Sequence, residues 1–131
     1  MREEIIRAAQ ERAVDGQVSC RDAHAIAAGL GVPPLEVGLA INRATDLRFF
    51  RCQLGLFGYG PKAEGRHKIA MAAPFVPPEM QAAVEELAED GAIGCAEVWA
   101  LAQRFEYPRL GVANIVEAMG MKLRRCQIGC F

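Results

Sequence analysis

EIIRAAQERAVDGQVSCRDAHAIAAGLGVPPLEVGLAINRATDLRFFRCQLGLF, residues 4–57, returns in diverged form as EMQAAVEELAEDGAIGCAEVWALAQRFEYPRLGVANIVEAMGMKLRRCQIGCF, residues 79–131. The two stretches align with a single one-residue gap. Identical positions include Asp15/Asp90, Gly16/Gly91, Cys20/Cys95, Ala27/Ala102, Pro33/Pro108, Leu35/Leu110, Val37/Val112, Arg51/Arg125, Cys52/Cys126, Gln53/Gln127, Gly55/Gly129 and Phe57/Phe131. The repeat has a period of about 75 residues. Solenoid repeats are shorter, at roughly 20 to 50 residues, so the sequence predicts two copies of one small domain.

The predicted organisation is repeat 1 over residues 1–58, a linker over residues 59–76 and repeat 2 over residues 77–131. The linker mixes Gly, Pro and charged residues without periodicity, which is typical of a connection of restricted flexibility. Each repeat is near the lower size limit for a domain that folds alone, so its core is thin. We therefore expect the two repeats to pack on one another as a pseudo-symmetric pair.

Charge and composition restrict the classes of function. The chain of 131 residues has a net charge of −1, and 52% of its residues are hydrophobic, which indicates a folded, helix-rich protein. Repeat 1 has seven basic and seven acidic side chains, whereas repeat 2 has five basic and eight acidic ones. Neutralisation of phosphates by basic side chains supplies most of the non-specific affinity for nucleic acids. Neither repeat is a basic domain of that kind.

Localisation follows from what the sequence lacks. The charged start MREEIIRAAQER has no apolar segment of a secretory signal, and the apolar run near residues 32–41 is interrupted by prolines and a glutamate. We expect a cytoplasmic protein without a membrane span. In that compartment the five cysteines stay reduced, and their odd number disfavours a closed disulfide framework.

Spacing predicts the same order of elements in each repeat. A first amphipathic helix is expected to end at Gly16 or Gly91, and a brief strand follows over residues 17–19 or 92–94. Ser19 with Asp22 matches a capping box, and Gly94 with Glu97 is a weaker version.

A second helix is predicted from Cys20 to about Leu30, and its counterpart from Cys95 to about Phe105. Proline then opens a third helix in each repeat. Alternating polarity after the third helix predicts a half-buried strand over residues 47–50 and 121–124.

This order resembles a winged helix-turn-helix domain, with IAAGLGVPPLEVGLAI as the helix-turn-helix unit. Ala27 is small where two helices cross, Gly31 allows a left-handed turn, and Val37 fills the core. Repeat 2 departs from the pattern, because Glu106 stands at the glycine position. The fold class we expect is mainly α with short β-strands, as two tandem three-helix winged-helix-like domains with truncated wings.

The wing is the second departure. The elements RCQLGLFG and RCQIGCF contain no Asn-Gly or Asp-Gly turn for a hairpin, and repeat 2 ends at Phe131. We expect the RCQ(L/I)G element to form one strand that pairs with the short early strand or with the other copy. Gly55 and Gly129 would then mark a bulge or a close backbone approach.

The resemblance implies a small DNA-binding protein, a transcriptional regulator whose third helices enter the major groove while nearby basic side chains hold phosphates. The duplication would imitate the usual homodimer. The residues that this function would use are Asn42, Arg43, Arg48, Arg51, Lys62, Arg66, Lys68, Arg109, Asn114, Lys122, Arg124 and Arg125.

The alternative is a protein-interaction or oligomerisation module that has the same fold and binds no DNA. It is favoured by the composition of the third helices, which place Glu36, Gly38 and Leu39 where groups that read bases are expected. The partner would be another protein or a second copy of the chain. A basic face across both repeats would favour DNA, whereas buried third helices would favour a protein partner.

Metal, redox and catalytic roles have less support. Cys20 and Cys95 open helices, and Cys126 with Cys130 forms a C-x-x-x-C pair, yet this spacing does not match a zinc site and free cysteines are commonly buried apolar residues. His24 aligns with Trp99, which favours a partly buried helix surface over a catalytic base. The sequence predicts no enzyme, no cofactor and no metal.

Overall fold

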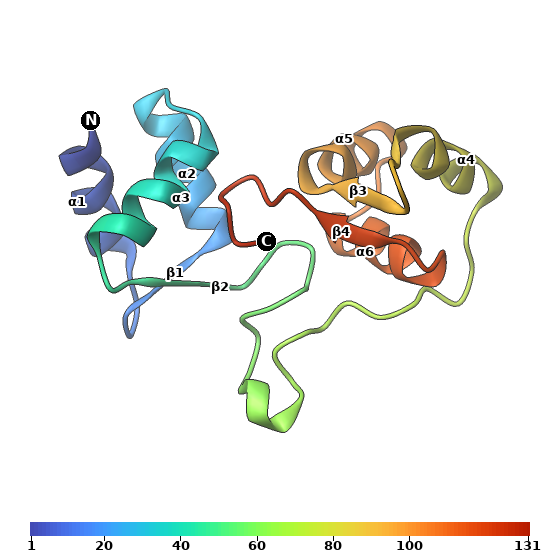
Figure 1. The fold of residues 1–131 in the computed structure, drawn as a ribbon, viewed down its shortest axis with the longest axis horizontal. Helices are drawn as coiled ribbons and strands as arrows, with labels where there is room; N and C mark the ends of the chain where they lie inside the picture. The colour runs from blue at the N-terminus through green and yellow to red at the C-terminus, as the bar shows by residue number, and fades with distance from the viewer.

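The structure is a computed structural model that describes residues 1–131, apart from the side chain of Lys62. It is mainly helical with short strands, which confirms the broad fold class, and it divides into two halves of equal element order joined by a long connection (Figure 1). Half one contains α1 (Arg2–Arg12), β1 (Gln17–Ser19), α2 (Cys20–Leu30), α3 (Pro34–Ala44) and β2 (Arg48–Phe50). The connection carries η1 (Lys62–Glu64), and half two contains α4 (Pro78–Leu87), β3 (Ala92–Gly94), α5 (Cys95–Phe105), α6 (Arg109–Ala118) and β4 (Lys122–Arg124).

Each half closes with a two-stranded parallel sheet. Val18 pairs with Phe49 in half one, and Ile93 pairs with Leu123 in half two. Because the paired strands are parallel, α2 and α3 or α5 and α6 form the crossover between them, and β2 and β4 are not parts of a hairpin.

The second and third helices meet as the sequence predicts. Gly31 takes the left-handed conformation at the end of α2, with φ +68°, and the axis of α3 is turned by 114° from that of α2. Glu106 takes the same conformation in half two, with φ +56°, so the turn survives without its glycine. A short turn between steeply crossing helices is the geometry of a helix-turn-helix unit.

The first helix of each half is shorter than the sequence predicts. α1 ends at Arg12, not at Gly16, because Val14 and Gln17 exchange two backbone hydrogen bonds of 2.9 and 3.0 Å. Asp15 and Gly16 both have positive φ, 51° and 76°, and form the turn between them. Half two repeats this correction, since α4 ends at Leu87.

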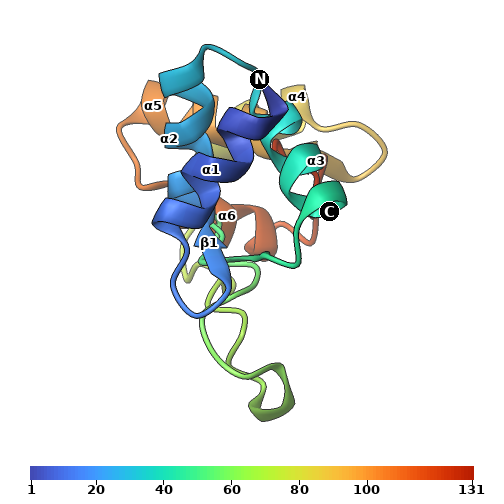
Figure 2. The same cartoon turned by 90° about the vertical axis from the view of Figure 1, so that its left-hand side faces the viewer.

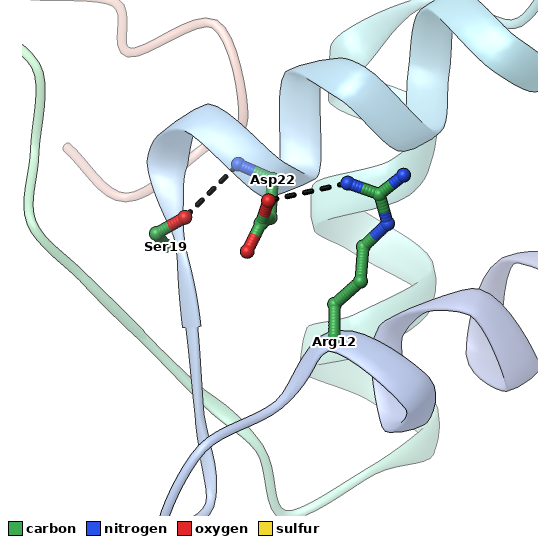
Figure 3. A network of polar contacts seen from close by, with 3 residues as sticks. All are labelled: Arg12, Ser19 and Asp22. Atoms are coloured by element: carbon green, nitrogen blue, oxygen red, sulfur yellow. Dashed lines mark hydrogen bonds and ion pairs between the residues drawn. The ribbon is translucent and has the colours of Figure 1, made fainter.

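A hydrogen-bonded cap fixes the start of α2 (Figure 3). The Ser19 hydroxyl accepts a hydrogen bond of 3.0 Å from the backbone N–H of Asp22, as the capping box requires. The Asp22 carboxylate does not return to Ser19; it accepts a hydrogen bond of 3.2 Å from Arg12 at the end of α1. The cap therefore also ties the first helix to the second.

The tails that follow β2 and β4 are exchanged between the halves. Tail one (residues 51–57) places Leu54 in the core of half two, and tail two (residues 125–131) places Ile128 in the core of half one. Figure 1 shows tail two leaving β4 and running across to α2 and α3, with the C-terminus close to half one. The RCQ(L/I)G element is therefore a turn that packs in the opposite half, and our prediction of a strand that pairs with the short early strand or with the other copy is wrong.

Reciprocal contacts show that the exchange follows the internal duplication. A Cβ atom added to Gly55 would lie 2.5 Å from Cδ1 of Leu110, and one added to Gly129 would lie 3.2 Å from Cδ1 of Leu35. Since the two glycines are aligned and the two leucines are aligned, each tail meets the same point of the opposite third helix. Of the bulge and the close backbone approach that we expected, Gly55 shows the close approach, since such a Cβ atom would also lie 3.1 Å from the backbone nitrogen of Ala70, whereas Gly129 meets only the Leu35 side chain.

The view along the long axis in Figure 2 shows the connection projecting from the body of the molecule, below the helices. Among the described residues no single helix is long and apolar enough to cross a membrane, although α2 and α3 taken together satisfy that criterion of length and composition.

Candidate functional site

Tail two covers part of the third helix of half one. Gly38 is buried in α3, and a Cβ atom there would collide with the backbone carbonyl of Ile128. Asn42, from the next turn of α3, lines a shallow groove together with Arg48, Gly129 and tail two. The face that would enter a DNA groove is thus partly occupied by the chain itself.

The connection covers α6 in a similar way. Asn114 accepts a hydrogen bond of 3.0 Å through its side-chain oxygen from the N–H of Met71, and one of 2.9 Å through its backbone oxygen from the N–H of Ala73. We call residues 69–76 the strap. Asn114, a candidate DNA-binding residue, therefore anchors the strap through both its side chain and its backbone.

The candidate DNA-binding residues of half one are exposed to solvent. Asn42 and Arg43 are exposed at the end of α3, and Arg48 and Arg51 are exposed in and after β2. Arg51 lies over the ring of Phe50, 5.2 Å from its centroid. None of the three arginines has an ion-pair partner among the described side chains.

Three of the other candidate cations are neutralised by carboxylates. Arg66 pairs with Glu64 at 3.1 Å, Lys68 pairs with Glu117 at 2.7 Å, and Arg125 contacts Glu97 at 3.4 Å and Glu89 at 3.9 Å. Lys122 and Arg124 are exposed on β4, and the Lys62 side chain lies outside what the structure describes. Among the described side chains, the candidate cations without an ion pair are Arg43, Arg48 and Arg51 in half one and Arg109, Lys122 and Arg124 in half two.

Arg109 belongs to a cluster at which two aligned positions of the halves meet. The rings of His24 and Trp99, which occupy aligned positions, lie 4.3 Å apart between centroids. The Arg109 guanidinium lies 3.5 Å from the Trp99 centroid and donates a hydrogen bond to the side chain of Gln53 in tail one. Burial, together with the positive charge of Arg109, lowers the pKa of His24 below its ordinary value.

The cysteines differ in accessibility. Cys20, Cys52 and Cys95 are buried, and burial raises the pKa of each thiol, to about 12 at Cys20. Cys126 is partly exposed and Cys130 is exposed. No group of described side chains has the arrangement of a metal site.

The strap exposes large apolar side chains from a backbone that is held in place. Met71 and Phe75 are each 70% exposed, and Ile69 is also exposed. The N–H groups of Ile69 and Ala70 donate hydrogen bonds of 2.8 and 2.9 Å to the carbonyl of Gly55. Our sequence interpretation missed this surface, although the apolar run IAMAAPFV within the connection was its visible signal.

Comparisons with known proteins add no assignment, because no protein-family model, no curated protein and no solved structure matches this chain.

Proposed function

We propose that this protein is a protein-interaction module whose contact surface is the strap. The observation that carries the proposal is the 70% exposure of both Met71 and Phe75 on a backbone that hydrogen bonds fix to α6 and tail one. Apolar side chains held in an ordered position lose little conformational entropy when a partner covers them. Both third helices are partly covered within the chain, which favours this function over two-site DNA reading.

The partner we propose is a second copy of the chain, paired strap to strap about a two-fold axis. Such a contact places Met71 and Phe75 of one copy against the same residues of the other, as an isologous interface requires. A net charge of −1 gives two copies little mutual repulsion. The interface would be of the small, reversible kind, because the strap is only eight residues long.

Sedimentation velocity over a concentration series tests the proposal. The wild type should pass from monomer to dimer as concentration rises, and Met71→Ser with Phe75→Ser should remain monomeric. Val14→Ser is the matched control, because Val14 is also a large exposed apolar residue but lies far from the strap in the sequence. A wild type that stays monomeric up to its solubility limit, or a Val14 variant that loses the dimer equally, would refute strap pairing.

A second function, DNA binding by a transcriptional regulator, is favoured by one specific observation. Arg43, Arg48 and Arg51 are exposed in half one, Arg48 lines one groove with Asn42, and none of the three arginines has an ion-pair partner among the described side chains. Three phosphate contacts give weak binding that falls steeply with salt. On this reading only half one contacts the duplex.

Electrophoretic retardation of mixed genomic fragments at low salt tests DNA binding. Arg43→Gln with Arg48→Gln should abolish retardation, and Lys122→Gln with Arg124→Gln on half two is the control that should retain it. No retardation at about 50 mM salt, or equal losses in both double variants, would exclude binding through half one.

A further inference from the structure

Tail two ends in a turn that brings two cysteines together. The N–H of Cys126 donates a hydrogen bond of 2.9 Å to the carbonyl of Phe131, and the N–H of Gly129 donates one of 3.0 Å to the carbonyl of Cys126. Gly129 takes φ +83°, which lets the chain reverse at this point. Because Cys126 is hydrogen-bonded through its backbone to both Gly129 and Phe131, the turn holds Cys130, which lies between those two residues, close to Cys126.

The same turn occurs in tail one without the second thiol. There the N–H of Cys52 bonds the carbonyl of Phe57 at 3.2 Å, and the N–H of Gly55 bonds the carbonyl of Cys52 at 2.9 Å. Leu56 stands where tail two has Cys130. The turn therefore needs no cysteine at this position in order to form, so the thiol of Cys130 is not explained by the fold.

Accessibility separates this pair from the other cysteines. Cys52 is buried in the core of half two and its tail presents no neighbouring thiol, whereas Cys130 opens into the groove that also contains Asn42 and Arg48. A reagent in solvent can thus reach the Cys126–Cys130 turn but not Cys20, Cys52 or Cys95.

We propose that Cys126 and Cys130 form a redox-active dithiol that is oxidised to an intramolecular disulfide by low-molecular-weight disulfides. The Cys126 thiolate attacks one sulfur of the oxidant R–S–S–R, forms a mixed disulfide and releases RS⁻, which takes up a proton. The Cys130 thiol then loses its proton, attacks the Cys126 sulfur and expels the second RS⁻. The sum is two thiols plus one disulfide giving one protein disulfide plus two RSH.

The assignment of roles follows from the local hydrogen bonds. Donation from Cys130 lowers the pKa of Cys126 to about 6 against the opposing effect of burial, and backbone N–H groups of the turn add to the lowering. The same interaction raises the pKa of Cys130, which stays protonated until Cys126 has reacted. Cys126 is therefore the attacking group and Cys130 the resolving group.

Oxidised glutathione is the probe for the test. The full chain is incubated with it, the remaining thiols are blocked with N-ethylmaleimide, and the digested protein is mapped by mass spectrometry. We expect a linked Cys126–Cys130 peptide, two mass units lighter than the reduced form, with the other three cysteines blocked only after denaturation. A pair that stays fully reduced under oxidising glutathione, or that gives only a glutathione adduct, would overturn the proposal.

Cys130→Leu is the matched variant, because tail one shows that leucine fits this turn. It should give a stable glutathione adduct on Cys126 and no internal disulfide, while circular dichroism and thermal unfolding stay as in the wild type. The midpoint of Cys126 alkylation against pH should rise from near 6 to above 8, with a several-fold slower reaction at pH 7. An unchanged pH profile would show that Cys130 does not act on Cys126.

Discussion

The two halves use the same tail in reciprocal positions but close the contact differently. In half one the third helix carries Gly38, and the backbone of tail two rests directly on it at Ile128. In half two the aligned residue is Ala113, which shares a core with Leu54 of tail one. The glycine in half one thus admits the backbone of tail two, and half two has a methyl group at the aligned position. The difference indicates that each tail is fitted to the opposite half and that the halves are no longer interchangeable.

The largest expected effect comes from truncating the buried side chains that the two tails place in the opposite halves. Leu54→Ala and Ile128→Ala each remove a fully buried side chain, and we expect a loss of about 2–5 kcal/mol in the free energy of unfolding, measured by urea denaturation. Hydrogen exchange should locate the damage across the exchange. Leu54→Ala should expose the amides of α6, and Ile128→Ala those of α3.

Leu56→Ala is a control from the same tail, because Leu56 is only partly buried and should cost less. If Leu54→Ala instead loosened α3 and left α6 protected, tail one would belong to its own half and the exchange would be wrong.

Gly38→Ala tests the close contact itself. Alanine is a better helix former than glycine by about 1 kcal/mol, but its Cβ would collide with the Ile128 carbonyl, so we expect a net loss of about 1–3 kcal/mol by urea denaturation. The opposite exchange, Ala113→Gly, should cost about 1 kcal/mol through helix propensity. A stabilised Gly38 variant would show that tail two does not rest on α3.

The sequence predicts the local elements well, because their signals lie in neighbouring residues. Gly31 and the prolines place the ends of α2 and the starts of the third helices where the structure has them. The error at the first helix has a local cause as well. Asp-Gly is the dipeptide preferred in a type I′ turn, and Asp15 and Gly16 both take positive φ. Gly16 therefore belongs to this turn, and our prediction that it ends the helix is wrong.

The exchanged tails and the strap could not be predicted in the same way. The apolar side chains of Leu54 and Ile128 indicate that each is buried. Their character does not say whether they are buried in the core of their own half or in that of the other half. The grouping of His24, Trp99 and Arg109 likewise depends on how the halves pack, which no local pattern records. Long-range packing therefore decides which candidate residues are free to bind and which are structural.

The helix starts offer a smaller test of the difference between halves. Ser19 caps α2, whereas Gly94 starts α5 without a side-chain cap. Ser19→Ala should cost about 1 kcal/mol, and Ser19→Gly only a few tenths, because glycine frees the N–H of the first turn for water. Thermal and urea unfolding of the two variants measure this. No loss in either variant would show that the Ser19 hydroxyl contributes nothing to the stability of α2.

The smallest expected effect concerns the protonation of His24. His24 faces the aligned Trp99, and burial with the nearby Arg109 charge lowers its pKa in the folded state below 6.5. The unfolded chain therefore binds a proton more readily than the folded one as the pH falls below 6.5. The stabilising effect of neutral His24 is complete above that pH and is lost progressively below it, down to the folded pKa.

His24→Phe keeps a ring against Trp99 and removes the titration. The free energy of unfolding, measured by urea denaturation from pH 7.5 to 5, should decline with a shallower slope in this variant than in the wild type. The difference cannot exceed about 1.4 kcal/mol per pH unit, which is the limit for one proton. A phenylalanine variant with the wild-type slope would mean that the folded protein admits the proton at His24 without penalty, and that the contact between His24 and Trp99 is open to water.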